Sequence, residues 1–201
     1  LFTKDADYLA FENVIDEVAK IAPIRVISYC LMPNHWHMQL WPQRAEQLSR
    51  FMQRLTLMHM RRWHAHHGTA GTGAVYQGRF KSFPVETDEH ALAVARYIER
   101  NALRASLVRR AEDWRWCSLW RRGNQSLPPW LVAGEHWPVE LPSNWLKLVN
   151  TPQTEAEEEA IRMSIRRGAP FGDDKWKQRA AARMKLQSSL REPWRPKKHR
   201  K

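Results

Sequence analysis

Apolar and polar positions alternate with three different spacings in the first 66 residues. Between Asp5 and Ile21 apolar residues recur every three or four positions, which predicts an amphipathic helix with Asp5 as its N-cap. The run Ile24–Leu31 is apolar and β-branched, as is typical of a buried strand, and His35–Trp41 alternates as a second strand would. A Pro-Asn pair between these runs supplies turn chemistry, so we expect an antiparallel hairpin.

A second helical spacing follows the hairpin. Apolar residues from Ala45 to His66 predict a long helix with Arg side chains elsewhere around its axis. A Gly-rich loop then leads to Val75–Glu86, which is expected to be a strand or an extended segment, and Thr87 begins a helix that runs to Arg100. The order helix, strand, strand, helix, strand, helix predicts an α+β fold in which helices pack on an antiparallel sheet.

The pattern loosens after Trp114 into segments rich in Trp and Pro. Helices are predicted over Glu155–Arg167 and Phe171–Gln187, whereas the polar, Pro-interrupted end of the chain is too hydrophilic to fold alone. We therefore expect a catalytic domain over residues 1–122, a Pro- and Trp-rich spacer over 123–154, and a helical basic C-terminal region over 155–201.

Charge changes this picture because it is unevenly distributed. The net charge is +12, and segments 1–42, 43–110, 111–160 and 161–201 carry −2, +7, −4 and +11. One basic block alone is equally typical of a solvated surface, but two blocks together favour a nucleic-acid partner, since clustered Arg and Lys release counterions from phosphates. No apolar run is long enough for a membrane span, and the two cysteines allow no disulfide framework, so we expect a cytoplasmic protein.

Two histidines stand out within the second predicted strand. Residues two apart on a strand share a face, so His35 and His37 point in one direction and Trp36 in the other. Adjacent imidazoles of this kind bind divalent cations when a third ligand approaches, which predicts a metal site. The alternative is a pair of polar residues on a solvent-facing side of the sheet.

The segment "ARYIERNALRA" offers candidates to complete such a site. Tyr97 and Asn101 are four residues apart on the predicted helix and therefore project from one face. The phenol of Tyr97 is a nucleophile that can form a covalent phosphodiester, and the amide oxygen of Asn101 suits a metal shell. Taken alone, Tyr97 is more typical of an amphipathic core tyrosine, and the catalytic interpretation depends on the nearby histidine pair.

The residues in this order resemble a known family. "MPNHWH" is similar to the His-hydrophobic-His motif of the HUH single-strand nucleases, and "YQGRFKS" followed by "RYIERNALRASLV" resembles the REP-associated tyrosine transposases. The resemblance covers residues 5 to about 120, and the region from "PFGDDKW" onwards also looks like that branch. It implies a ferredoxin-like HUH fold with a helical basic C-terminal extension.

The resemblance also implies roles and a reaction. His35, His37 and Asn101 would bind Mg²⁺ or Mn²⁺, and Tyr97 would be the nucleophile that cleaves and rejoins single-stranded hairpin DNA through a 5′-phosphotyrosine. Family members begin with an additional strand that this sequence lacks, so we expect the sheet to miss its first strand. Ala102 also stands where proline is common in the family.

Contacts to single-stranded or hairpin DNA are predicted for the basic residues. Clustered cations would bind phosphates, and Trp36 or Trp41 would stack bases, although Trp36 is better suited to the core. The predicted phosphate contacts are Arg50, Arg54, Arg61, Arg62, Arg79, Lys81, Lys197, Lys198 and Arg200.

Two other functions remain open at this stage. "HWHMQ" also resembles the signature of histidine-triad nucleotidyl transferases, in which His37 itself would attack a phosphate without a metal or a tyrosine. The second alternative is a non-catalytic nucleic-acid binder derived from a transposase. We expect a monomer that does not contact membranes.

Overall fold

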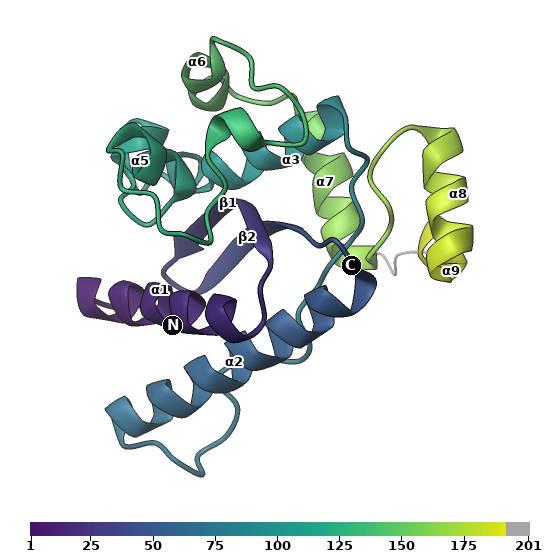
Figure 1. Ribbon diagram of the computed structural model, residues 1–201. Helices are drawn as coiled ribbons and strands as arrows, with labels where there is room; N and C mark the ends of the chain where they lie inside the picture. The colour runs from purple at the N-terminus through teal and green to yellow at the C-terminus, as the bar shows by residue number, and fades with distance from the viewer. Residues whose placement is uncertain (192–201) are drawn as a thin grey trace, which may run out of the picture. The chain divides into compact units, whose positions relative to one another are not determined.

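The computed structural model describes residues 1–191 and divides them into two compact units (Figure 1). The first unit comprises residues 1–80 and 92–153, and the second comprises residues 81–91 together with the C-terminal helices from residue 154. The predicted domain boundaries at residues 122 and 154 are not tested by this division into compact units and stay a prediction. Among the described residues, no helix is long and apolar enough to cross a membrane.

A two-stranded antiparallel hairpin lies at the centre of the first unit. It consists of β1 (Arg25–Met32) and β2 (His35–Trp41), with Cys30 opposite His37 in the register. Every residue of β1 after Arg25 is buried, because β1 has packing on both faces, whereas β2 is half-buried. The α+β class and the hairpin are confirmed.

Two helices cover one face of this hairpin. These are α1 (Asp5–Ile21) and α2 (Ala45–His67), which bury Phe11 and Leu55 against Tyr29 of β1. The apolar spacing that predicted both helices is the side that packs on the sheet. Trp36 joins this core, as its place on β2 predicts.

The start of α1 differs from the prediction by one residue. Lys4, not Asp5, has the extended backbone of an N-cap. The carboxylate of Asp7 accepts hydrogen bonds from the backbone N–H groups of Thr3 and Lys4, at 2.8 and 3.1 Å. Because Asp7 accepts these hydrogen bonds from inside the first turn, Asp5 is not needed as the N-cap and is the first residue of the helix.

The opposite face of the sheet packs against α3 (Glu89–Glu99), whose residues from Leu92 onwards belong to the first unit. Ala95 of this helix lies in a cluster with Ile27 of β1. The short α4 (Asn101–Arg104) follows α3 after Arg100, so the predicted single helix is interrupted near its end. The sheet is thus enclosed between two helical layers (Figure 1).

Of the two forms predicted for Val75–Glu86, a strand or an extended segment, the strand is wrong. Residues 75–79 are bends, residues 80–84 belong to no helix or strand, and Val85 makes an isolated bridge to Phe171 within the second unit. Gly78 has a φ of 85°, a left-handed conformation that a regular strand does not contain.

The free edge of β1 is also not open, in contrast to the expectation from a missing strand. The backbone N–H of Val26 donates to the carbonyl of Trp130 at 3.1 Å, and that of Leu31 donates to Trp116 at 2.9 Å. Two short segments that lie far along the chain therefore satisfy the edge that a further strand would occupy.

Helix α5 (Ser118–Gly123) connects both helical layers to β1 through consecutive arginines. Arg121 pairs with buried Glu12 of α1, and Arg122 pairs with fully buried Glu99 of α3 at 2.5 Å. The shorter elements of this unit are η1 (Ala111–Asp113), η2 (Gly134–His136) and α6 (Trp145–Asn150).

The second unit contains α7 (Glu155–Arg167), α8 (Asp174–Met184) and α9 (Gln187–Leu190). The limits of α7 agree with the prediction, because Thr154 caps its start and Gly168, with a φ of 67°, ends it. The helix predicted over Phe171–Gln187 is shorter and broken. Helix α8 begins only after Asp173, because the side chain of Asp173 caps it by accepting from the backbone N–H of Trp176. Lys185, which has a left-handed backbone conformation, separates α8 from α9.

Candidate functional site

Two imidazoles lie on the face of β2 that is turned toward α3 and α4. The ring centroids of His35 and His37 are 5.0 Å apart. Trp36, between them in sequence, packs into the core on the opposite face. Strand alternation therefore brings the two histidines together as predicted.

The second half of the site comes from the end of α3 and from α4. The ring of Tyr97 lies 5.9 Å from that of His37 and nearly perpendicular to it, at 79°. Tyr97 and Asn101 are 5% and 3% exposed. The interruption at Arg100 is mild, since its backbone remains in the right-handed helical region and its carbonyl accepts from the N–H of Arg104. Tyr97 thus lies beside His37, and Asn101 follows it one turn later. That Asn101 joins the histidines in one site stays a prediction.

Arg104 is a site residue that the sequence analysis did not select. Its guanidinium carbon lies 4.0 Å from the centroid of the Tyr97 ring, and its Nη2 donates to Oδ1 of Asn101 at 2.8 Å. Its position in the sequence, three residues after Asn101 and seven after Tyr97, is a signal that could have found it, because residues at this spacing share a helix face.

Electrostatics keep both histidines neutral near pH 7. Burial, followed by the charges of His35 and Arg104, lowers the pKa of His37 to about 3. Desolvation, and then Arg104, also lowers the pKa of His35. A neutral imidazole retains a nitrogen lone pair, which is the form that binds a metal.

The donors fit a divalent cation in their chemistry. Nδ1 of His35 lies 2.6 Å from Oδ1 of Asn34, so this contact orients the ring and leaves Nε2 as its ligand atom. His37 offers a second imidazole and Asn101 a buried amide. Oδ1 of Asn101, the atom that would bind the ion, accepts one hydrogen bond from Arg104 and has a second lone pair for a metal. Two imidazoles and an amide oxygen are ligands that Mn²⁺ and Mg²⁺ accept.

Two other groups of His and carboxylate side chains are close enough to hold an ion: Asp7 with His66 and His67, and Glu86 with Asp88 and His90. Both have structural roles. Asp7 caps α1, Asp88 accepts from the backbone N–H of His90 at 2.8 Å, and Glu86 accepts from that of Asp173 at 2.8 Å. One oxygen of each of these three carboxylates therefore already accepts a hydrogen bond from the backbone at or near a helix start.

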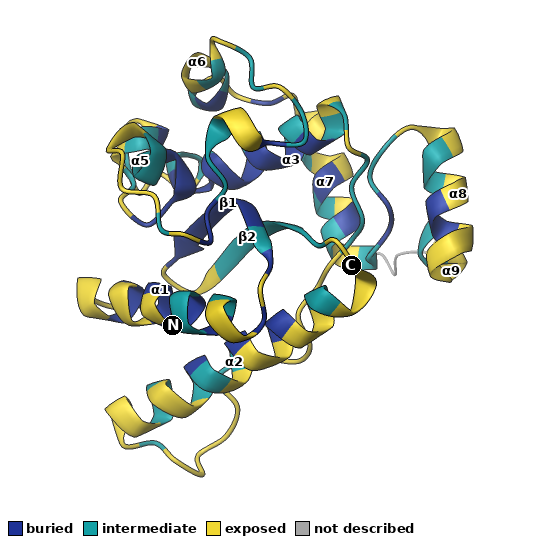
Figure 2. Cartoon of the chain, viewed as in Figure 1, coloured by how far each residue is buried: buried dark blue, intermediate teal, exposed yellow. Residues whose placement is uncertain are grey.

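The predicted DNA-contacting residues of α2 fall into two groups. Arg50, Arg54 and Arg61 are exposed and lie within about 40° of one another around the axis of α2, and we call this the outer side of the helix. Figure 2 shows the exposed residues along α2 in yellow. Arg62 instead makes two hydrogen bonds to Glu17 of α1, at 2.8 and 2.7 Å.

The remaining predicted DNA contacts are less informative. Arg79 and Lys81 are exposed. Lys197, Lys198 and Arg200 lie outside the described residues. Trp41 is covered by Arg25, whose guanidinium lies 3.5 Å from the ring centroid, so this face of Trp41 is not available for a base.

Comparison with known proteins agrees with this geometry. A family model described as "Transposase IS200 like" matches residues 1–101, which is half of the chain. The matched segment includes both histidines, Tyr97 and Asn101 and ends before Arg104. No curated protein and no solved structure matches the chain.

Proposed function

The chain belongs to the IS200-like transposase family, and from this premise we propose that it cleaves and rejoins single-stranded DNA at hairpin sequences, in the manner of the REP-associated tyrosine transposases. The observation that carries the proposal is the arrangement around Tyr97. The ring of Tyr97, near the end of α3, lies 5.9 Å from the imidazole ring of His37, and the guanidinium carbon of Arg104 lies 4.0 Å from the same ring. A nucleophile, neutral metal-binding imidazoles and a phosphate-binding cation together suit phosphoryl transfer.

Tyr97 is the proposed nucleophile. Its Oη would form a bond to the scissile phosphorus while the bond from phosphorus to the 3′ oxygen breaks, which leaves a 3′-hydroxyl and a 5′-phosphotyrosine. The phenolic proton leaves to solvent or base, and the 3′ oxygen takes up a proton. Since one phosphodiester replaces another, a second 3′-hydroxyl can attack the phosphotyrosine and rejoin DNA without ATP.

His35, His37 and Asn101 are the proposed ligands of Mg²⁺ or Mn²⁺. When bound, such a cation supplies Lewis-acid polarisation of the scissile phosphate. Asn101 is held in place by Arg104, and His35 by Asn34, so the chain fixes its ligands before DNA arrives.

Arg104 is proposed to stabilise charge on the phosphoryl group. Its guanidinium already lies over Tyr97, so a phosphate that approaches the phenol comes within reach of a fixed positive charge. The charge that develops on the transferred group is therefore met without rearrangement of the side chain.

The rival functions predict different products. A histidine-triad transferase would attach the nucleotide to His37, and a non-catalytic binder would form no covalent product. The pairing of His37 with His35 and Tyr97, and the basic surface of α2, favour the transposase chemistry.

The decisive experiment incubates the full chain with a single-stranded hairpin oligonucleotide and a divalent metal, followed by a denaturing gel and mass spectrometry. We expect an adduct on Tyr97 that carries the fragment 3′ to the break. Tyr97→Phe should abolish the adduct but retain binding, and EDTA should prevent it. An adduct on His37, attachment through a 3′ end, or full activity in EDTA would contradict the proposal.

A further inference from the structure

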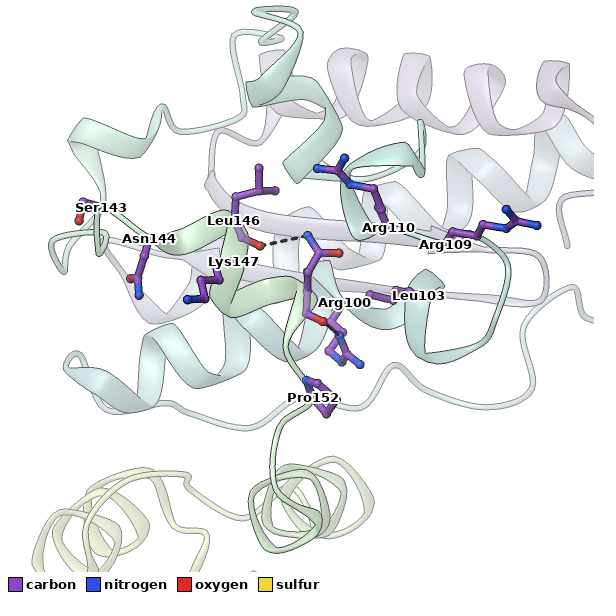
Figure 3. A pocket seen from close by; sticks show the side chains of 10 residues that line it. Arg100, Leu103, Arg109, Arg110, Ser143, Asn144, Leu146, Lys147 and Pro152 are labelled. Atoms are coloured by element: carbon purple, nitrogen blue, oxygen red, sulfur yellow. Dashed lines mark hydrogen bonds between the residues drawn. The ribbon is translucent and has the colours of Figure 1, made fainter.

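A cavity lies on the other side of α4 from the candidate site. It has a volume of about 690 Å³, and all of its lining residues belong to the first unit (Figure 3). Leu103 of α4 lines it, whereas Arg104 lies over the ring of Tyr97 and donates to Asn101, and neither Arg104 nor Asn101 lines the cavity. The same short helix therefore separates the cavity from the reacting groups.

The cavity combines an apolar lining with positive charge at its ends. Leu103, Leu146 and Pro152 supply the apolar surface, and Leu146 is 44% exposed. Lys147 and Arg109 lie at opposite ends of the view in Figure 3. Planar aromatic ligands bind apolar surfaces of this kind, and phosphates bind the flanking cations.

The positive charge of the cavity is not neutralised by neighbouring acids. Lys147 and Arg109 are exposed and have no acidic partner in the part of the chain that the structure describes. Glu112, the carboxylate near the cavity, pairs with Arg110 and accepts from Nδ2 of Asn150 at 2.7 Å. An anionic ligand would thus meet two cations that the fold does not use.

Arg100 contributes to the wall rather than to the charge available for a ligand. Its Nη1 donates to the carbonyls of Val149 and Asn150, at 3.0 and 2.8 Å, and so ties the end of α6 to the start of α4. The cavity is consequently held open by hydrogen bonds between two helices that are both part of the first unit.

We propose that this cavity binds one nucleotide of the DNA strand, a few positions away from the scissile phosphate. The proposal rests on the proposed single-strand nuclease function. A helix with its side chains is about 10–12 Å across, so a strand that crosses α4 from the site reaches the cavity within a few nucleotides. The volume falls in the range of about 300–1,000 Å³ that is usual for small-ligand sites. The base would pack on Leu103 and Leu146, and its phosphates would pair with Lys147 and Arg109.

The test uses the full chain with Tyr97→Phe, so that DNA is bound but not cut. Hairpin oligonucleotides, each with a single abasic site at a different position near the cleavage point, are titrated by fluorescence anisotropy. We expect one or two adjacent positions at which loss of the base weakens binding by about tenfold. Adding Leu146→Asp should remove this positional penalty, since it places a carboxylate on the apolar surface.

The cations are tested by the salt dependence of the same binding. Replacing Lys147 and Arg109 by Gln should reduce the slope of log affinity against log salt by about two, whereas the matched pair Lys20→Gln and Arg115→Gln should change it less. Circular dichroism and thermal unfolding of each variant confirm that it is folded.

Several results would overturn the proposal. One is an abasic profile that is unchanged by Leu146→Asp, and another is equal slopes for the two pairs of variants. Competition by free deoxynucleoside monophosphates without any positional penalty would assign the cavity to a free nucleotide instead. If wild-type protein forms no tyrosine adduct but the positional penalty persists, the nuclease function fails while the nucleotide site stands.

Discussion

Each face of the β1–β2 sheet has one histidine whose pKa is strongly lowered, yet the residues around the two histidines differ. On the α1 and α2 face, burial lowers the pKa of His59 to about 4, and its Nδ1 lies 2.6 Å from the hydroxyl of Tyr76. On the α3 and α4 face, burial lowers the pKa of His37 to about 3.

The neighbours of the two histidines, not their pKa values, separate their roles. His59 packs against the rings of Phe2 and Phe11, at 5.8 and 4.7 Å, and its ring nitrogen contacts a tyrosine hydroxyl rather than a second imidazole. His37 lies beside a second imidazole and a tyrosine. A depressed histidine pKa therefore reports desolvation, and only the groups around the ring indicate chemistry.

The largest expected effect comes from the carboxylates that anchor each face. Glu99→Ala leaves Arg122 without its acid and deprives Ser118 and Trp145 of their acceptor, so the free energy of unfolding should fall by about 3–5 kcal/mol in urea titrations. Glu12→Ala should cost a similar amount, because Arg121 and Tyr29 lose their partner.

The two carboxylate variants should differ in activity. At a temperature where both are folded, Glu99→Ala should slow adduct formation, since it loosens the helix that carries Tyr97, and Glu12→Ala should not. Glu99→Gln serves if the alanine variant does not fold. Equal rates for the Glu12 and Glu99 variants would show that the faces are not independent.

The next effect distinguishes the two histidines directly. His37→Ala should slow adduct formation by about 100-fold or more, with partial recovery at high Mn²⁺ if His35 and Asn101 still hold the ion. His59→Gln should leave the rate per folded molecule close to that of wild type. Single-turnover kinetics with a labelled hairpin measure both, and a loss of similar size in the two variants would refute the division of roles.

Protonation should oppose folding on both faces. Because the unfolded histidines titrate near pH 6.5 and the folded ones far lower, the unfolded state binds more protons between these values, and stability is lost as the pH falls below about 6.5. Near pH 5, His59→Gln should reduce the slope of unfolding free energy against pH by about 1.4 kcal/mol per pH unit. Urea titrations at closely spaced pH values measure the slope, and parallel curves for the variant and wild type would contradict this assignment.

The smallest expected effect concerns the outer side of α2. Each of Arg50→Gln and Arg61→Gln should lower the slope of log affinity against log salt for DNA by about one, whereas Arg62→Gln should lower it less because Glu17 already holds this side chain. Anisotropy titrations at several salt concentrations provide the slopes. If all three variants keep the wild-type slope, α2 is not part of the DNA-binding surface.

Local patterns were sufficient to predict much of this molecule. The limits of β2 and α7 and the end of α1 follow from apolar spacing and caps, and the shared face of His35 and His37 follows from strand alternation alone. Contacts between distant segments were not accessible in this way. The failure of the strand over Val75–Glu86 reflects a left-handed glycine and a β1 edge already bonded to Trp116 and Trp130.

The candidate site shows the same limit. Helical spacing placed Tyr97 and Asn101 on one face, although the helix is interrupted at Arg100, which is the N-cap of α4. Arg104 was overlooked as one arginine among many, since charge alone does not reveal which guanidinium lies over a tyrosine. The cavity lined by Leu103 and Leu146 depends on α6, whose packing against the start of α4 has no local signature in the sequence.

The consecutive arginines of α5 have a consequence for where this molecule can be cut. Both carboxylates that they neutralise, Glu12 and Glu99, fall inside the segment that the family model matches, yet Arg121 and Arg122 lie beyond its end. A piece restricted to residues 1–101 would bury two acids with no counter-charge. The segment that the family model matches is therefore shorter than the segment that contains both ion pairs. During synthesis, neither helical layer can complete its ion pair until α5 has left the ribosome.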